Sequence, residues 1–180
     1  MLDQTRLPVA DERVRLRPLR ASDATGYTTG SADADVRSYA HLPEPEYTPE
    51  SVRRMIERDA APGLERGDLA VLAIAEAESD AFAGSLVIFD VSADGAEVGF
   101  WLHPEARGKG YASAALSLAA EFARTSGLRT LTARTVPDNI GSQRVLGAAG
   151  FEQGGSEAGI TPSGQRVELM HYALQLRDRA

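Results

Sequence analysis

The order of strand and helix patterns from residue 69 to residue 135 constrains the fold of this chain more than any other feature of its sequence. Three segments with the composition of strands, 69–76, 81–91 and 96–103, are separated by short turns with the sequences AESD and SADG. Turns of this length join antiparallel neighbours, so the three segments are predicted to form a meander. A long helix pattern follows at 108–125, and another strand pattern at 128–135. The helix pattern has apolar residues at helical spacing: Ala112, Ala115, Leu116, Ala119, Phe122 and Ala123. A strand, a helix and a strand in succession predict a parallel pair inside a mixed sheet, and therefore an α/β domain.

The remaining segments extend this core on both sides. Residues 13–19 alternate apolar and basic side chains and predict a first strand. Ser22 and Asp23 indicate the start of a short helix that a loop follows, and Thr48-Pro49 is a helix start with proline at the first helical position. The C-terminal part is predicted to hold a short helix at 139–150 and closing strands at 151–155 and 166–174.

Composition excludes several classes of protein. The net charge is −7 at pH 7, 43% of the residues are hydrophobic, and the chain contains no cysteine. The acidic charge disfavours nucleic acid as a partner, because binding to phosphates needs a basic surface. The lack of cysteine excludes disulfides and thiolate metal sites, and we predict no metal. Since no stretch has the length of a membrane span, we expect no membrane partner and a cytoplasmic location.

The segment Arg107-Gly108-Lys109-Gly110 at the start of the long helix predicts an anion site. Glycine is a poor choice for a helix, but a helix N-terminus offers unpaired N–H groups and the positive end of a dipole. Two glycines allow a phosphate to approach the main chain closely, and two cations add charge. Two common phosphate-binding patterns do not fit. The pattern G-x-x-x-x-G-K-[ST] requires serine or threonine where Gly110 stands, and G-x-G-x-x-G requires glycine where Ser113 stands.

The residues from Arg107 to Ala112 do match the pattern [QR]-x-x-G-x-[GA], and in its context the sequence resembles the GNAT superfamily of N-acetyltransferases. The pattern follows a strand and opens a helix within GFWLHPEARGKGYA. Downstream, VPDNIGSQRVLGAAGF is similar to the family's N-x-x-[SA] segment with its later GF. The opening RVRLRPLRASDA resembles the ribosomal-protein-alanine (Rim-type) N-acetyltransferase branch. The resemblance therefore extends over nearly the whole chain.

This resemblance implies the GNAT fold. That fold is a mixed, mostly antiparallel sheet of about six or seven strands, with helices on both faces and a splayed parallel strand pair at the centre. Residues 1–180 would form a single acetyltransferase domain. Within it, the first strand and the acceptor-side helices would come from residues 13–62. The central strands and the helix for the acetyl-CoA pyrophosphate would come from residues 69–135, and the C-terminal helix and strands from residues 136–180.

The resemblance also implies acetyl-CoA as the acetyl donor. Its pyrophosphate would lie on the main-chain N–H groups from Gly108 to Ala112. Its pantetheine arm would lie beside Leu102, where a backbone N–H can polarise the thioester carbonyl. Asn139 also suits a plain helix cap, and Trp101 suits the core or the acceptor site. The implied cofactor-binding residues are Phe100, Trp101, Leu102, Arg107, Gly108, Lys109, Gly110, Tyr111, Ala112, Asn139, Ser142 and Arg144.

Transfer of an acetyl group to an amine requires a base that takes a proton from the ammonium. Glu97 is the candidate, because a charged residue within an otherwise apolar strand is costly unless it is paired or functional. A structural pair with Arg134 and a solvent-facing position are the alternatives. Many relatives protonate the departing thiolate with a tyrosine, but Leu146 occupies the matching position. Ser142 is then the candidate proton donor, with a purely cofactor-binding role as its alternative.

We therefore predict an acetyl-CoA-dependent N-acetyltransferase that moves the acetyl group directly to a primary amine. The acceptor is expected to be a protein N-terminal amine or a small-molecule amine, and to enter between residues 21–62 and 159–169. An antibiotic-modifying enzyme of self-resistance and a CoA-binding regulatory module without catalysis are the alternatives. A homodimer is a further expectation.

Overall fold

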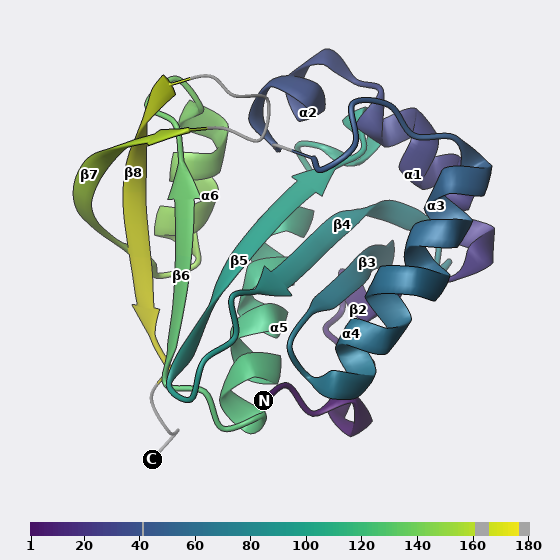
Figure 1. Ribbon diagram of the computed structural model, residues 1–180, viewed down its shortest axis with the longest axis horizontal. Helices are drawn as coiled ribbons and strands as arrows, with labels where there is room; N and C mark the ends of the chain where they lie inside the picture. Colours follow the sequence, from purple (N-terminus) through teal and green to yellow (C-terminus); the bar gives the residue numbers. More distant parts are fainter. Residues whose placement is uncertain (41, 161–165, 177–180) are drawn as a thin grey trace.

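An eight-stranded sheet runs through the molecule in the order β1-β2-β3-β4-β5-β6-β8-β7 (Figure 1). The computed structural model describes residues 1–40, 42–160 and 166–176. All neighbouring strands are antiparallel except β5 and β6, which are parallel, so the predicted mixed and mostly antiparallel sheet is confirmed. The strands are β1 (Val9–Ala10), β2 (Val14–Pro18), β3 (Ala70–Glu76), β4 (Phe82–Phe89), β5 (Gly95–Leu102), β6 (Thr130–Thr135), β7 (Glu152–Ile160) and β8 (Arg166–Gln175).

The sheet has one strand more than the upper expected count of seven. The additional strand is β1, whose two residues pair with Leu16 and Arg15 of β2. A segment of two residues is too short to show the alternation by which a strand is detected in a sequence. The strand expected at 151–155 continues to Ile160, although all but one of the residues of β7 are exposed.

Helices cover both faces of the sheet, as expected (Figure 1). Neighbouring residues of β3 point to opposite faces: Leu72 and Ile74 belong to the core cluster that includes α5, and Ala73 to the cluster with α1, α2 and α3. None of the described helices is long and apolar enough to cross a membrane. The helices are α1 (Ala24–Ser31), α2 (Ala34–Tyr39), α3 (Pro49–Met55), the π-helical η3 (Ile56–Ala60), α4 (Ala61–Arg66), α5 (Tyr111–Thr125) and α6 (Ile140–Ala148), with short 3₁₀ turns η1 (Gln4–Arg6), η2 (Ala21–Asp23) and η4 (Pro104–Ala106).

The alanine-rich helix α5 buries the apolar stripe that its spacing predicted. All six predicted positions are at most 7% exposed: Ala112, Ala115, Leu116, Ala119, Phe122 and Ala123. The helix begins at Tyr111 rather than at the expected Gly108. Gly108 and Gly110 have positive φ values, +75° and +76°. Both therefore adopt the left-handed backbone conformation, which is incompatible with a right-handed α-helix. The predicted loop after the first helix likewise contains α2, which Asp33 caps by accepting hydrogen bonds from the N–H groups of Asp35 and Val36.

The parallel pair separates after three residue pairs. Gly95, Ala96 and Glu97 of β5 lie opposite Thr130, Leu131 and Thr132 of β6. Beyond Glu97, β5 continues beside β4 to Leu102, while β6 continues beside β8 to Thr135. The two strands diverge visibly toward their C-terminal ends (Figure 1). The predicted splayed pair is therefore present, and Glu97 is the last residue of β5 that pairs with β6.

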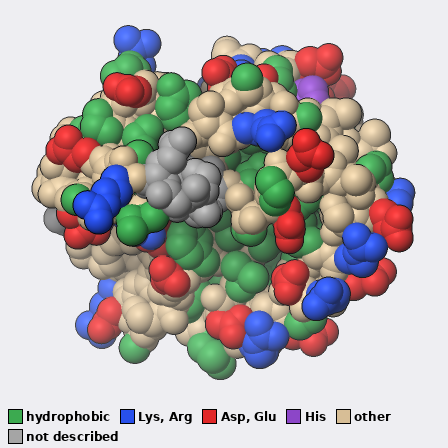
Figure 2. Space-filling view, turned by 45° about the horizontal axis from the view of Figure 1, so that its top comes forward, with side chains coloured by type: hydrophobic (Ala, Val, Ile, Leu, Met, Phe, Trp, Pro, Cys, Tyr) green, Lys and Arg blue, Asp and Glu red, His purple; other side chains and the backbone are tan. Residues whose placement is uncertain are grey.

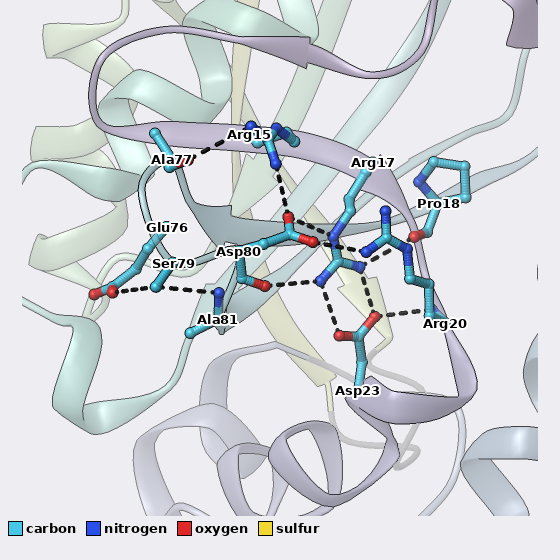
Figure 3. Close-up of polar contacts among 10 residues, drawn as sticks. All are labelled: Arg15, Arg17, Pro18, Arg20, Asp23, Glu76, Ala77, Ser79, Asp80 and Ala81. Carbon is cyan, nitrogen blue, oxygen red and sulfur yellow. Dashed lines mark hydrogen bonds and ion pairs between the residues drawn. The ribbon is translucent and has the colours of Figure 1, made fainter.

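A buried ion-pair cluster fastens β2 to the turn between β3 and β4 (Figure 3). The Arg17 guanidinium is almost fully buried and donates to both oxygens of Asp23, at 2.8 and 3.0 Å. It also donates to Asp80, at 3.0 Å, and Arg15 and Arg20 reach the same carboxylate. Hydrogen bonds from Arg17 hold the pKa of Asp80 below its ordinary value. Asp23 is therefore the main partner of Arg17, and its side chain does not cap α1. It does cap the preceding short helix η2, because it accepts a hydrogen bond of 2.8 Å from the Arg20 N–H.

Replacement of Asp23 tests how much this cluster stabilises the fold. Asp23→Asn keeps the shape but removes the charge that compensates a buried guanidinium, so we expect a loss of about 3 kcal/mol in the free energy of unfolding. Urea titration followed by circular dichroism measures this. Asp68→Asn is the matched control, because its pair with Arg66 is solvent-exposed and should contribute much less to the free energy of unfolding. Equal losses in the two variants would contradict a stabilising role for the buried pair.

Candidate active site

A cavity of about 1510 Å³ opens where β5 and β6 diverge. Its lining comes from the helices of one face (α1 to α3 and η3), strands β3 to β6, the loop before α5, and the starts of α5 and α6. Ile160 of β7 and Leu169 of β8, from the region expected at the acceptor entrance, line it as well. Pockets for one small molecule have volumes of roughly 300–1,000 Å³, so this cavity has room for two ligands side by side. Figure 2 shows hydrophobic side chains gathered in a hollow, with carboxylate side chains around it.

The loop before α5 exposes main chain to this cavity. A Cβ atom added at Gly108 would meet nothing within 4 Å, so positive φ is the only reason visible in the structure for glycine at this position. Gly110 is the N-cap of α5, and no side chain caps this helix end in the described part of the chain. The first N–H groups of the helix thus lack a side-chain acceptor. Ala112 and Ser113 of the first turn line the cavity as well.

The two cations of the loop are held by carboxylates. Arg107 donates to Asp33 and Asp35 at the start of α2, and its hydrogen bond lowers the pKa of Asp33. The ammonium of Lys109 lies 3.5 Å from a Glu76 oxygen. Tyr111 donates its hydroxyl hydrogen to the same carboxylate, at 3.0 Å. Lys109 is not among the residues that line the cavity, whereas Arg107 and Tyr111 are.

Glu97 and Arg134 form an ion pair at the point of divergence. The Arg134 Nε donates to Glu97 Oε1 at 2.9 Å, and the side chain of Glu97 is 16% exposed. The hydrogen bond to Glu97 raises the pKa of the Arg134 guanidinium, which therefore stays charged. Both side chains line the cavity. The structural pair that the sequence offered as an alternative thus exists, and it leaves the Glu97 carboxylate within the cavity.

The start of α6 forms the wall opposite β5. Asn139 caps this helix, because its Oδ1 accepts a hydrogen bond of 3.0 Å from the N–H of Ser142. Asn139 and Ser142 both line the cavity. Leu146, at the position where relatives carry tyrosine, is fully buried. Arg144 is exposed and is not among the lining residues, so the structure provides no contact that supports its assignment to the cofactor.

The three predicted residues of β5 reach the cavity in different ways. The indole of Trp101 packs edge-to-face against Tyr27 and Phe82, with ring centroids 5.1 and 5.8 Å away. Phe100 and Leu102 pack against the core cluster of the opposite face. The core alternative therefore describes the Trp101 side chain, and a cofactor role for Trp101 would have to use its main chain.

Sequence reasoning missed two parts of the cavity. Val71, Val87 and Phe89 line it from β3 and β4, although their apolar strand pattern is typical of a sealed core. Arg58 and Asp59 line it from the π-helical turn η3, for which the letters PESVRRMIERDAAP carry no local signal. A π-helical turn is uncommon and frequently occurs at a functional site.

Comparisons with known proteins agree with this geometry. Residues 13–152 match the family described as "Acetyltransferase (GNAT) domain". RimJ of Mycobacterium smegmatis, solved in complex with a CoA disulfide, is 22% identical in sequence, with a TM-score of 0.82. The match covers 90% of this chain and 81% of the RimJ chain. The ribosomal-protein-S5-alanine acetyltransferase of Vibrio fischeri is 17% identical with a TM-score of 0.80, covering 96% and 98%. The microcin C7 self-immunity acetyltransferase MccE, in complex with acetyl-CoA and AMP, is 16% identical with a TM-score of 0.81, covering 92% and 93%. No curated protein matches the sequence.

The chain belongs to the GNAT acetyltransferase family. The matched residues span β2 to the start of β7 and include the glycine loop, the divergent strands and the start of α6. The protein is therefore an acetyltransferase by family, with a fold that it shares with Rim-type N-acetyltransferases.

Paired glycine substitutions test the role of backbone conformation in the loop. Gly108 and Gly147 both have open space around an added Cβ, but only Gly108 has a positive φ. Gly108→Ala should lower the free energy of unfolding by about 1 kcal/mol, because alanine is strained in the left-handed region. Gly147→Ala, within α6, should raise it by about 0.5 kcal/mol through helix propensity. Thermal and urea unfolding of both variants measure the difference, and effects of the same sign would contradict this explanation.

Proposed function

We propose that the protein transfers an acetyl group directly from acetyl-CoA to a primary amine. The observation that carries the proposal is the combination, in one cavity, of a strand that loses its partner after Glu97 and an uncapped helix start with a glycine loop. The Glu97 carboxylate stands at the point where β5 and β6 separate, and it lines the same cavity. A small-molecule amine and a protein N-terminal amine both remain within this proposal.

The described residues fit acetyl-CoA. Its pyrophosphate suits the N–H groups from Gly108 to Ala112, because a 15-residue helix presents its positive end there without a side-chain cap. Its pantetheine arm suits the edge of β5 from Val98 to Leu102, which β6 leaves unpaired. Arg107 and Lys109 are engaged by carboxylates, so we assign the phosphate contacts chiefly to the main chain.

Acetyl-CoA supplies a thioester, whose acetyl group forms an amide with the amine nitrogen as the bond to sulfur breaks. The acceptor arrives as an ammonium ion and must lose a proton before it can attack. We assign that proton to the Glu97 carboxylate, which Arg134 orients through the 2.9 Å hydrogen bond. Ser142 is the candidate donor of a proton to the departing sulfur, because it lines the cavity from the opposite wall.

Three further expectations stay predictions. The net charge of −7 supports partners other than nucleic acid. A homodimer and a cytoplasmic location rest on the sequence analysis alone. The ribosomal-protein-S5-alanine acetyltransferase of Vibrio fischeri and the self-immunity acetyltransferase MccE have nearly equal TM-scores, 0.80 and 0.81. Fold similarity therefore does not choose between a ribosomal-protein acceptor and the self-resistance alternative.

Thermal unfolding with acetyl-CoA tests the donor. For a dissociation constant of about 10 μM, a ligand concentration of about 1 mM stabilises the fold by about 2.7 kcal/mol. In a domain of this size the melting temperature should rise by about 5–10 °C. ATP and NADPH are the controls, and a shift with either of them but none with acetyl-CoA would refute the proposed donor.

Glu97→Gln tests the base. The amide cannot take a proton, so kcat should fall on the order of 10²-fold, and most strongly at low pH, where the acceptor is protonated. The acetyl-CoA thermal shift should be unchanged. Asp90→Asn is the matched control, because Asp90 also raises the pKa of Arg134 through its charge but does not line the cavity. A Glu97→Gln enzyme with the parent's pH–rate profile would exclude proton transfer to Glu97.

A further inference from the structure

Strands β3, β4 and β5 lie beneath the acceptor-side helices, and their side chains bear on the chemical class of the acceptor. Side chains of β3, β4 and β5 form cross-strand rows on this face of the sheet. Ala73, Ser85 and Trp101 lie opposite one another and make one row. They are 0%, 3% and 7% exposed, and Tyr27 of α1 packs on the indole. The helices thus bury this row almost completely, and Ser85 and Trp101 only border the cavity.

The next row is apolar but open. Val71, Val87 and Gly99 lie opposite one another, and all three line the cavity. Val71 and Val87 are only half-buried, although β3 and β4 have neighbouring strands on both sides. In the row after it, Phe89 lies opposite Glu97 and also lines the cavity. The carboxylate therefore stands at the edge of a hydrocarbon and aromatic floor, which we define as Val71, Val87, Phe89 and Gly99.

Gly99 makes this floor deeper beside Glu97. Residues two apart on a strand share a face, so Gly99 lies between Glu97 and Trp101. Its φ is outside the left-handed region, and an added Cβ would meet only Val87 Cγ1 at 3.4 Å and Phe89 Cε1 at 4.0 Å. Neither the backbone nor a neighbouring side chain therefore demands glycine. Glycine inside a strand weakens the strand, and it often marks close approach of a ligand.

A second apolar surface, on the side of the acceptor-side helices, borders the same part of the cavity. Leu42, Tyr47 and Met55 line it, and all three pack against the buried cluster of Tyr27 and Trp101. Their exposed apolar surface adds to that of the floor, in accord with the hydrophobic side chains in the hollow of Figure 2. Apolar surface of this kind gains most from covering a ligand that is itself apolar.

We propose that the acceptor is a primary amine whose amino-bearing carbon carries an apolar side chain of several carbon atoms. The amino group lies at Glu97, and the apolar side chain lies on the floor. A polar or polycationic amine would leave this surface uncovered. The proposal rests on acetyl transfer at Glu97, and it applies equally to a free amine and to the N-terminal residue of a peptide.

Matched amides test the acceptor class with the intact protein. Leucinamide and serinamide differ only in the side chain on the amino-bearing carbon. Release of CoA should give a kcat/KM at least about tenfold higher for leucinamide, as expected of an apolar pocket. Tetrapeptides that begin with leucine and serine should follow the same order. The ratio of kcat/KM for each tetrapeptide to that for the matching amide shows whether the acceptor is a peptide N-terminus or a free amine. Spermidine represents polycationic acceptors.

Gly99→Val tests the floor itself. Valine suits a strand, and its methyl groups fill the space beside Glu97. We expect kcat/KM for leucinamide to fall at least about tenfold and that for serinamide to fall less, because the shorter serine side chain needs less of the floor. Gly155→Val is the matched control: it makes the same change in the outer strand β7, where an added Cβ meets nothing within 4 Å. Val87→Thr keeps the shape of the side chain and adds a hydroxyl group. It should also lower the ratio of kcat/KM for leucinamide to that for serinamide, and it provides a second test if Gly99→Val does not fold.

Several outcomes would overturn the apolar acceptor while acetyl transfer stands. They are equal or faster acetylation of serinamide or spermidine, no acetylation of any apolar amine by a protein that binds acetyl-CoA, and unchanged leucinamide kinetics in folded Gly99→Val and Val87→Thr variants. Failure of the proposed function has a different signature. In that case acetyl-CoA gives no thermal shift and no amine releases CoA.

Discussion

The short ladder between β5 and β6 is the constraint on which the rest of the site depends. Three residue pairs hold the strands together, and β5 then continues with hydrogen-bonded pairing on its β4 side alone. This places Glu97 at the fork and leaves an unpaired main-chain edge beyond it. Because β6 remains bonded to β8, the two halves of the sheet are each well paired, and the gap lies between them. The cavity is thus a consequence of strand topology, to which the helices add walls.

The glycine loop completes the site by a different physical means. Gly108 and Gly110 adopt backbone conformations that other residues rarely adopt, and they bring the start of α5 to the cavity without side chains in the way. The side chains on either side, Arg107 and Lys109, connect this loop to α2 and to the end of β3. The main chain is therefore available to a ligand, while the side chains fix its position.

Local patterns predicted much of this structure. The apolar stripe of α5, the meander and the parallel crossover follow from periodicity and turn length, which act over a few residues. Glu97 could be identified because a charged side chain in an otherwise apolar strand is costly unless it is paired or functional. Contacts between distant segments were not predictable: Arg17 and Asp80 are 63 residues apart in the chain, and Asp23 had the pattern of a helix cap. The floor of Val71 and Val87 was missed for a related reason, since a strand pattern shows which face is apolar but not whether a helix covers it.

Two of the unpaired strand edges of this sheet, the outer edge at β7 and the part of β5 beyond Glu97, differ in what can reach them. An open edge is normally a template on which other chains aggregate, and proteins protect it with charge, bulges or cover. The outer edge, β7, carries Glu152 and Glu157 and an irregularity in its pairing, which make it a poor template. The edge of β5 lacks such protection, but β6 and α6 flank it within the molecule (Figure 1). The open edge of β5 thus lies within the molecule beside the cavity, so the protein keeps it without the aggregation hazard that an outer edge carries.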